Sequence, residues 1–374
     1  MTHTLLGGLS PTRFLREVWH KRPLLIRNAV PGFAGLAGAA ELQQLACRDD
    51  VESRLIRGTG KHWQLDHGPF RKCDFRRLPK TDWTLLVQSL NHFLPGADAL
   101  LSRFDFIPHA RLDDLMVSYA VPGGSVGPHF DSYDVFLLQG TGHRRWQIST
   151  QTDLALIDGA PLKILRRFEA EAEWVLGPGD MLYLPPHVAH HGVAVDTCTT
   201  YSIGFRAPTA DEFAQGFLMY LQDSIQLEGR YADPDLRRQK HPGEIGRAML
   251  DQIEGMLAKI RWTRADVAEF AGRYLSEPKP NVFFDAPAAP LSRAAFDKAA
   301  ARHGVALAAK SRLLFAGRRF YINGEAFTPA AGEVAALTQL ADRRRLPPPL
   351  PAALRPRLHE WHEAGWLEIA HEPV

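Results

Sequence analysis

The chain has 374 residues, enough for two or three domains of ordinary size. Its content of 45% hydrophobic and 23% charged residues excludes a disordered or fibrous protein, because such chains contain far fewer apolar residues. The formal net charge of +2 argues against a protein that coats nucleic acid or an anionic membrane surface.

The cysteines indicate the cellular compartment of the protein, and the least polar stretch indicates whether it enters a membrane. Cys47, Cys73 and Cys198 are odd in number and far apart, which is typical of free thiols in a reducing compartment. We therefore expect a cytoplasmic protein. The least polar stretch, 29–40, is interrupted by Pro31 and several glycines, and it is shorter than the roughly 20 apolar residues of a membrane span. We expect no membrane partner.

The first part of the chain predicts helices, and the middle part predicts a sheet. The expected helices near the start are Pro11–His20, Ala40–Leu45 and Asp82–Asn91. From residue 115 to residue 206, short apolar runs alternate with Gly and Pro residues. These runs are Leu115–Val121, Val135–Gln139, Arg144–Ile148, Met181–Leu184 and Thr199–Phe205. Short strands at this spacing predict an antiparallel sandwich or barrel.

Amphipathic helices follow the predicted barrel. Thr209 and Glu212 have the spacing of a capping box, so a helix is expected to begin there. Further apolar stripes at helical spacing predict one helix within 245–260 and another that begins near Thr263. The segment 276–290 contains four prolines and is predicted to be a linker.

The last part of the chain has the pattern of a winged helix. Asn323-Gly324 is a strong hairpin turn signal, and the expected strands 319–321 and 325–327 flank it. Helices are predicted at 332–341 and 352–364, and a short apolar run ends the pattern at 366–369. Packing or oligomerisation is the favoured role for such a module. Nucleic-acid contact is the alternative.

A histidine and an aspartate form the first half of a candidate metal site. His129 and Asp131 are two residues apart, so on an extended strand both side chains lie on one face. A histidine cluster that includes His190 follows 59 residues after Asp131, behind a Gly-Asp turn and a Pro-Pro corner. Two histidines and one carboxylate leave coordination positions open, which suits a non-haem Fe(II) oxygenase.

The cluster offers three candidates for the remaining ligand. His190 shares its strand face with the small residues Gly192 and Ala194, which leave room for a metal ion. His191 lies on the opposite face and is expected to be a core or surface residue. His187 lies in the Pro-Pro corner and is expected to face solvent. The pattern favours His190.

An inward-pointing arginine indicates an anionic cosubstrate. The period of two places Arg144 on one face with Trp146 and Ile148. A buried arginine is costly unless a carboxylate pairs with it, and its planar fork suits bidentate carboxylate binding. The natural candidate is 2-oxoglutarate, and an internal Arg–Asp pair is the alternative. Ser118, on the inward face of a neighbouring strand, could complete the carboxylate site or be an ordinary core hydroxyl.

The motifs resemble those of the bacterial JmjC-type ribosomal oxygenases. The resemblance covers nearly the whole chain and is strongest from about residue 111 to 208. It rests on Asp113-Asp-Leu-Met-Val-Ser118, on 121–136 with its Gly-Pro-His-Phe-Asp core, on Gln139-Gly-Thr-Gly142 with Arg144-Arg-Trp146, on Leu176-Gly-Pro-Gly-Asp180, on Tyr183-Leu-Pro-Pro186 and on Tyr201-Ser-Ile-Gly-Phe-Arg-Ala-Pro208.

The resemblance implies an α+β multidomain protein. It implies a double-stranded β-helix (cupin/JmjC) catalytic domain at 1–208 with N-terminal helices, a helical dimerisation domain at 209–280 and a C-terminal winged helix at 281–374. A homodimer follows, and no direct nucleic-acid binding is expected.

The resemblance also implies a reaction and a set of ligands. Fe(II) is expected on His129, Asp131 and His190, with 2-oxoglutarate anchored by Arg144 and Ser118 and with O2 as the oxidant. The implied reaction is hydroxylation at carbon 3 of an arginine in a basic loop of a large-subunit ribosomal protein. Asp114, Tyr133 and Asp134 are candidates for contact with that cationic loop.

Other functions remain open at this point. Relatives of the family hydroxylate histidine, so a ribosomal histidine hydroxylase is the first alternative. A metal-dependent cupin without a keto-acid cosubstrate is the second, and it leaves Arg144 without a purpose. A ribosome-binding protein with an inactive barrel is the third alternative, and it predicts that one of the metal-ligating residues is missing. A demethylase is the fourth, and it would use the same residues as a hydroxylase.

Overall fold

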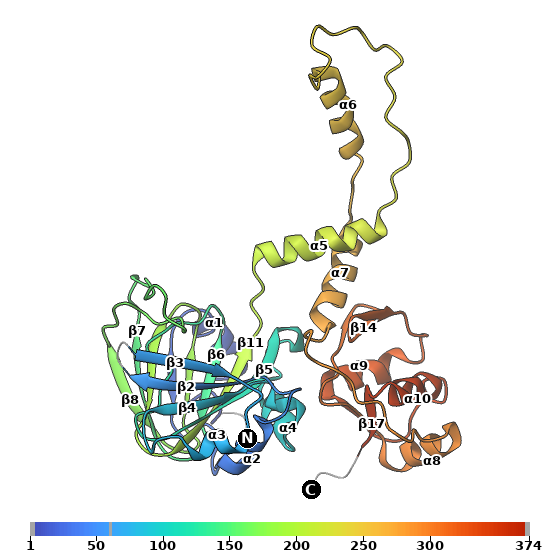
Figure 1. Cartoon of the computed structure of the whole chain (residues 1–374). Coiled ribbons are helices and arrows are strands. Elements are labelled where there is room, and N and C mark those ends of the chain that lie inside the picture. Colours follow the sequence, from blue (N-terminus) through green and yellow to red (C-terminus); the bar gives the residue numbers. More distant parts are fainter. Residues whose placement is uncertain (1–3, 60–61, 371–374) are drawn as a thin grey trace. The chain divides into compact units, whose positions relative to one another are not determined.

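The computed structural model describes residues 4–59 and 62–370 (Figure 1). The chain forms two compact units that are discontinuous in sequence. The first contains the chain up to Ala207, the segment Pro278–Ser311 and the chain from Asp342 onward, and the second contains Pro208–Glu277 and Arg312–Ala341. No helix of the described residues is long and apolar enough to cross a bilayer.

An eight-stranded antiparallel sheet forms the larger wall of the first unit. Its strand order is β1-β9-β6-β11-β5-β4-β2-β3. The strands are β1 (Leu24–Ile26), β2 (Ser53–Thr59), β3 (His62–His67), β4 (Trp83–Val87), β5 (Leu112–Ala120), β6 (Val135–Gln139), β9 (Met181–Leu184) and β11 (Cys198–Phe205). β6, β9 and β11 are buried at every position, because both faces of this sheet are covered.

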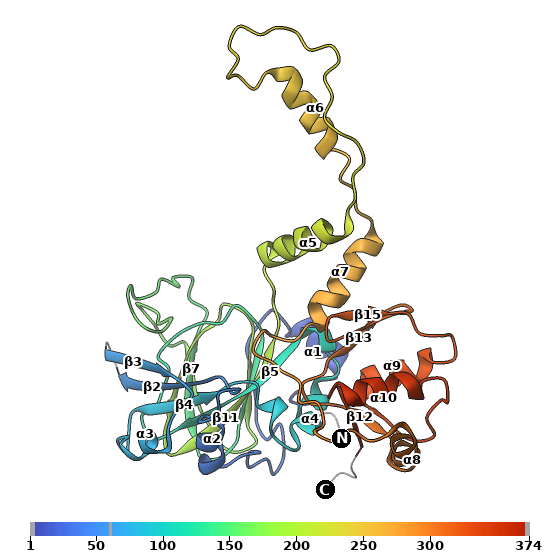
Figure 2. The same ribbon diagram turned by 45° about the vertical axis from the view of Figure 1, so that its right-hand side comes forward.

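A three-stranded antiparallel sheet forms the opposite wall. It has the order β10-β7-β8, with β7 at Arg144–Ser149, β8 at Ala172–Leu176 and β10 at Ala189–Ala194. Val135 and Leu137 of the large sheet share a buried cluster with Trp146 and Leu176 of the small one. The two sheets therefore enclose a barrel, which Figure 2 shows from a second side. This confirms the predicted double-stranded β-helix.

Short helices from the N-terminal part cover the outside of the large sheet. They are α1 (Pro11–Glu17), α2 (Ala39–Leu45), α3 (Lys72–Arg76) and α4 (Ala97–Leu101). Phe14 of α1 and Leu42 of α2 share one buried cluster with the β11 residue Tyr201. α1 begins where predicted, because the Ser10 hydroxyl accepts a hydrogen bond from the Arg13 N–H.

One expected helix is wrong. Instead of a helix over Asp82–Asn91, the structure has β4, followed by a short 3-10 turn at Leu90–His92. β4 is buried at all of its positions between β2 and β5, so it is a continuous apolar run without alternation. Such a run does not distinguish a buried strand from a helix segment. The β2–β3 hairpin and β8 were not predicted either.

The C-terminal part of the first unit contains another small sheet. Its order is β16-β12-β17, and its elements are α8 (Arg293–His303), β12 (Val305–Leu307), β16 (Arg345–Leu346), α10 (Arg355–Glu363) and β17 (Leu367–Ile369). Phe296 of α8 and Leu358 of α10 are fully buried. The predicted helix at 352–364 and the final apolar strand are confirmed.

The second unit confirms the predicted helix starts and the hairpin. Its elements are α5 (Ala210–Ser224), α6 (Arg247–Leu257), α7 (Arg264–Ser276), β13 (Leu313–Ala316), β14 (Arg319–Ile322), β15 (Glu325–Phe327) and α9 (Val334–Arg343). Thr209 and Glu212 form the expected capping box, and Thr263 caps α7. Asn323 and Gly324 have φ angles of 50° and 88°, as the tight turn between β14 and β15 requires.

Candidate metal centre and cosubstrate site

The three predicted ligand residues meet inside the barrel of the first unit. One ligand atom from each of His129, Asp131 and His190 lies within 4.8 Å of the other two. His190 Nε2 is 3.7 Å from Asp131 Oδ2, and the two imidazole centroids are 4.2 Å apart. No other trio of His, Cys, Asp or Glu side chains has this spacing in the described part of the chain.

A single backbone bridge, rather than a strand, brings the ligand residues together. The segment between β5 and β6 is irregular except at His129, which pairs with His190. The His129 N–H donates to the His190 carbonyl at 2.9 Å, and the His190 N–H donates back at 2.7 Å. Directly paired residues place their side chains side by side. The His187 N–H donates to the Asp131 carbonyl at 2.8 Å. This hydrogen bond fixes the backbone of Asp131 beside the start of β10.

Backbone carbonyls set the tautomers of both imidazoles. His129 Nδ1 is 3.0 Å from the Gly127 oxygen, and His190 Nδ1 is 3.0 Å from the Val188 oxygen. A carbonyl only accepts, so in the neutral rings Nδ1 is protonated and Nε2 retains its lone pair. Burial, and then the neighbouring His129, lower the pKa of His190 to about 4. The ring is therefore neutral at pH 7, as metal ligation requires.

The other two histidines of the cluster lie where the alternation predicts. His190 is 2% exposed, whereas His187 is exposed in the corner before β10. His191 points to the other face, where its ring lies 6.1 Å from that of Phe168. Neither His187 nor His191 belongs to the ligand trio.

Arg144 is buried without a carboxylate. It is 3% exposed, and its Nε and Nη2 atoms have no hydrogen-bond partner within residues 4–59 and 62–370. Its guanidinium carbon lies 5.7 Å from the centre of the Trp146 ring. The alternative of an internal Arg–Asp pair is therefore wrong. A buried cation of this kind requires an anion from outside the chain.

Ser118 lies on the inner face of the large sheet. It is 4% exposed and pairs in register with Thr200 of β11 and Leu86 of β4. Thr200 donates to Gln139 at 3.0 Å, so a buried polar row crosses this wall of the barrel. The sequence did not predict Thr200 or Gln139 in this row, because their contact joins strands 61 residues apart.

The register orders the candidate residues along the small sheet. Arg144 is opposite Ala194, Trp146 is opposite Gly192, and Ile148 is opposite His190. His190 and Ala194 are four residues apart on one strand, so the backbones of Arg144 and His190 lie roughly 13 Å apart along the wall. Trp146 and Gly192 form the part of the wall between them.

The suggested substrate contacts have different surroundings. Asp134 is fully buried and accepts a hydrogen bond from Tyr183 Oη at 2.6 Å, so it is occupied by the protein itself. Asp114 is 5% exposed and accepts from the Ser89 N–H and hydroxyl. Tyr133 is 41% exposed, and its pKa is raised by desolvation and then by the Asp131 and Asp114 carboxylates.

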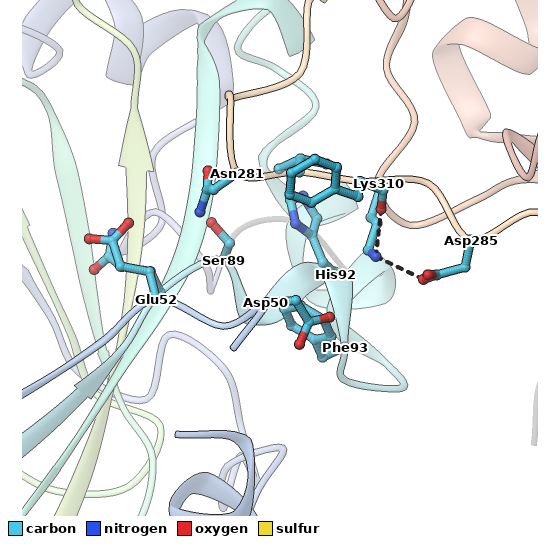
Figure 3. Close-up of a pocket in the computed structure, with 11 residues that line it drawn as sticks. Asp50, Glu52, Ser89, His92, Phe93, Asn281, Asp285 and Lys310 are labelled. Carbon is cyan, nitrogen blue, oxygen red and sulfur yellow. Dashed lines mark hydrogen bonds and ion pairs between the residues drawn. The ribbon is translucent and has the colours of Figure 1, made fainter. Parts of the chain in front are cut away.

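A separate hollow on the first unit has no part in this arrangement. It lies beside the linker residues 281–283, and Figure 3 shows Lys310 closing one side. The Lys310 ammonium donates to the Phe283 carbonyl at 2.8 Å and to Asp285 at 2.9 Å. None of the candidate metal or cosubstrate residues lines this hollow. The candidate active site is therefore the barrel interior.

A double-stranded β-helix with two histidines and a carboxylate on its inner wall defines the cupin class of metal-binding barrels. Residues 99–213 match the family model of the JmjC domain, and residues 259–368 match that of the ROXA-like winged helix. The second match confirms the predicted C-terminal winged helix.

Known proteins narrow the class to a family. The ribosomal protein uL16 3-hydroxylase of Escherichia coli (strain K12) is 36% identical over 278 residues, which are 74% of this chain and 74% of that protein. A crystal structure of E. coli YcfD superposes with a TM-score of 0.84 and 32% identity over 96% of this chain and 98% of that chain. YcfD in complex with cobalt and 2-oxoglutarate gives a TM-score of 0.80 at 32% identity and the same coverage. This chain belongs to the family of JmjC-domain ribosomal oxygenases.

Proposed function

We propose that this protein is an Fe(II)- and 2-oxoglutarate-dependent dioxygenase that hydroxylates carbon 3 of an arginine in a large-subunit ribosomal protein. The observation on which the proposal rests is the buried, unpaired Arg144 in the same barrel as the His129–Asp131–His190 trio. The 36% identity to a ribosomal protein uL16 3-hydroxylase supports the choice of substrate.

The donor set suits Fe(II). Two neutral imidazoles and one carboxylate would hold the ion and leave positions open for a cosubstrate. Arg144 would bind the far carboxylate of 2-oxoglutarate in a bidentate manner, with the Ser118 hydroxyl as a further donor. Fe(II), when bound, supplies the O2 chemistry that couples decarboxylation of 2-oxoglutarate to hydroxylation of a C–H bond. The apolar walls around Trp146 and Ile148 exclude water from this reaction.

The carboxylates near Tyr133 would suit a cationic substrate side chain. Asp131 and Asp114 both raise the pKa of Tyr133, so their charges act on the same exposed phenol. We propose Asp114 and Tyr133 as substrate contacts: the carboxylate would attract a guanidinium, and the ring would pack against its planar face. Asp134 is left out of this role because Tyr183 binds one of its carboxylate oxygens and Arg111 the other, whereas the hydrogen bonds from Gln88 and Ser89 to Asp114 all go to Oδ2.

Mass spectrometry tests the proposed function directly. Purified protein incubated with Fe(II), 2-oxoglutarate and a ribosomal protein mixture should add one oxygen atom to an arginine of a large-subunit protein. Omission of 2-oxoglutarate is the control. Addition to a histidine would favour the first alternative, a ribosomal histidine hydroxylase. Turnover that is independent of 2-oxoglutarate would favour another metal-dependent cupin enzyme.

We further propose that the helices of 209–280 form a homodimer. α6 has no buried residue, and several apolar side chains of α5 and α6 are exposed, among them Leu218, Met219 and Leu250. A surface of this kind in a monomer would be a liability in water. Sedimentation of wild type and of Leu250→Glu should give a dimer and a monomer, respectively. A Leu250→Glu dimer would place the interface elsewhere.

The proposed compartment is the cytoplasm, where ribosomal proteins are available as substrates. The three cysteines, Cys47, Cys73 and Cys198, are all free, as expected of a reducing compartment. We also propose that the catalytic domain ends at residue 208 and that the dimerisation domain ends at residue 280. The winged helix is proposed as a packing module without direct contact to nucleic acid.

A further inference from the structure

Trp146 has a buried hydrogen-bond donor that the proposed mechanism does not yet use. Its side chain is 5% exposed, and its indole nitrogen has no acceptor among the residues that the structure describes. Most buried donors in folded proteins have a partner, because an unpaired donor has lost its hydrogen bonds to water without replacement. An orphan donor beside the proposed cosubstrate site therefore indicates an acceptor that a ligand supplies.

The surroundings of Trp146 locate that acceptor. The guanidinium carbon of Arg144 is 5.7 Å from the Trp146 ring centre, and the His190 ring is 5.9 Å away on the other side. Trp146 thus lies between the cation proposed for the distal carboxylate and the proposed metal ligands. A ligand that spans these two points must pass over the indole.

Gly192 explains why the indole can occupy this place. A Cβ atom at position 192 would lie only 2.6–2.9 Å from three carbons of the Trp146 benzene ring, closer than real Cβ atoms approach. These carbons belong to the six-membered ring, so the pyrrole side with Nε1 faces away from β10. The glycine thereby fixes the depth of the indole and the direction of its N–H.

We infer that the Trp146 indole N–H donates a hydrogen bond to the distal carboxylate of the bound 2-oxo dicarboxylic acid, beside Arg144. The inference rests on the proposed function, since it requires a cosubstrate in this cavity. Trp146 and Arg144 together then supply the donors for that carboxylate, which has more acceptor sites than one guanidinium fills. Trp146 would thereby contribute to selecting a dicarboxylic over a monocarboxylic 2-oxo acid.

The inference predicts an effect of Trp146→Phe on cosubstrate binding but not on the stability of the free protein. Trp146→Phe removes the N–H and keeps an aromatic ring. The free protein should lose no thermal stability from the missing donor, because the donor has no partner there. The dissociation constant for 2-oxoglutarate on the Co(II)-loaded protein should rise about tenfold, the cost of one hydrogen bond to a charged group. Pyruvate, which lacks the distal carboxylate, should bind both proteins equally.

Trp174→Phe is the matched control, because Trp174 is the cross-strand partner of Trp146 on β8 and, among the described residues, is not one of those with a buried unpaired nitrogen. It should leave 2-oxoglutarate binding unchanged. Equal affinity of wild type and Trp146→Phe for 2-oxoglutarate would overturn the inference, and so would equal weakening for pyruvate. If wild type itself does not bind 2-oxoglutarate, the proposed function fails instead.

A spectroscopic measurement keeps the inference testable even if the variant is unstable. The chain contains eight tryptophans, so ¹⁵N-tryptophan labelling gives a small set of indole signals, which single Trp→Phe variants assign. In the diamagnetic Zn(II)-loaded protein, the Trp146 indole proton should move downfield when 2-oxoglutarate is added and should remain in place when pyruvate is added. An indole proton that is indifferent to 2-oxoglutarate would refute the hydrogen bond.

Discussion

Asp131 and Asp134 are three residues apart in the sequence, yet their surroundings are opposite. Asp134 is fully buried, accepts from Tyr183 Oη at 2.6 Å, and has His20 Nδ1 at 3.3 Å and Arg111 Nη2 at 3.5 Å. Asp131 instead lies 3.7 Å from the neutral His190 Nε2, beyond hydrogen-bond distance, and pairs with no lysine or arginine of the described residues.

The comparison distinguishes a carboxylate that the protein itself binds, Asp134, from one that is available to a metal ion, Asp131. Burial raises the pKa of Asp134, and the hydrogen bond from Tyr183 with the charges of His20 and Arg111 counteracts this effect. The Asp134 carboxylate thus has its hydrogen bonds and its counter-charges from the protein itself. At Asp131 one carboxylate oxygen and two imidazole nitrogens lie within 4.8 Å of one another, which is an arrangement that a cation completes. Residue types alone would not distinguish the two groups.

Replacement of Asp131 should give the largest functional effect. Asp131→Ala removes the anionic ligand and should weaken Co(II) binding by more than about 100-fold, since changes outside the first coordination shell already cost 10–100-fold. Turnover should be lost. A Co(II) titration followed by visible absorption measures the affinity. His191→Ala, on the opposite strand face, should bind Co(II) as wild type does, and normal binding by Asp131→Ala would remove this residue from the site.

Replacement of Asp134 should have the complementary effect. Asp134→Ala leaves the Tyr183 hydroxyl and the Arg111 guanidinium without their shared carboxylate, so the free energy of unfolding should fall by about 3 kcal/mol. Urea unfolding provides the value, and Co(II) binding by the folded fraction should be unchanged. Asp196→Ala breaks an exposed pair with His143 and should cost under about 1 kcal/mol. Equal costs for the two variants would contradict the distinction drawn above.

The two neighbouring arginines extend the comparison to the cosubstrate. Arg144→Ala should raise the dissociation constant for 2-oxoglutarate by roughly 30- to 150-fold, which corresponds to about 2–3 kcal/mol for a buried ion pair. Co(II) affinity should remain near that of wild type. Arg145 is exposed on the other face of β7, and Arg145→Ala should leave both affinities unchanged. An unchanged response to 2-oxoglutarate in Arg144→Ala would exclude the proposed anchor.

The smallest effect is expected at Ser118. Ser118→Ala removes one hydroxyl donor and should weaken 2-oxoglutarate binding by about 1 kcal/mol, or roughly fivefold. The same titration measures it, with the variant's melting temperature as the control for packing. A loss of stability without a change in affinity would assign Ser118 to the core rather than to the cosubstrate site.

Local signals predicted much of this fold. Thr209 and Thr263 begin helices because a capping box needs only four consecutive residues, and Asn323-Gly324 forms its turn for the same reason. β4 was assigned incorrectly because its burial on both faces comes from β2 and β5, which removes the alternation that identifies a strand.

The sequence by itself determined the residue types of the site and their faces. The period of two placed Arg144 with Trp146 and His190 with Gly192, since side-chain direction along a strand is a local property. Only the tertiary structure decided that His129 pairs with His190 across the bridge, and that Arg144 lacks a carboxylate and the Trp146 N–H an acceptor among the residues described. Whether a buried group has a partner depends on every segment that packs around it, and those segments are distant in sequence.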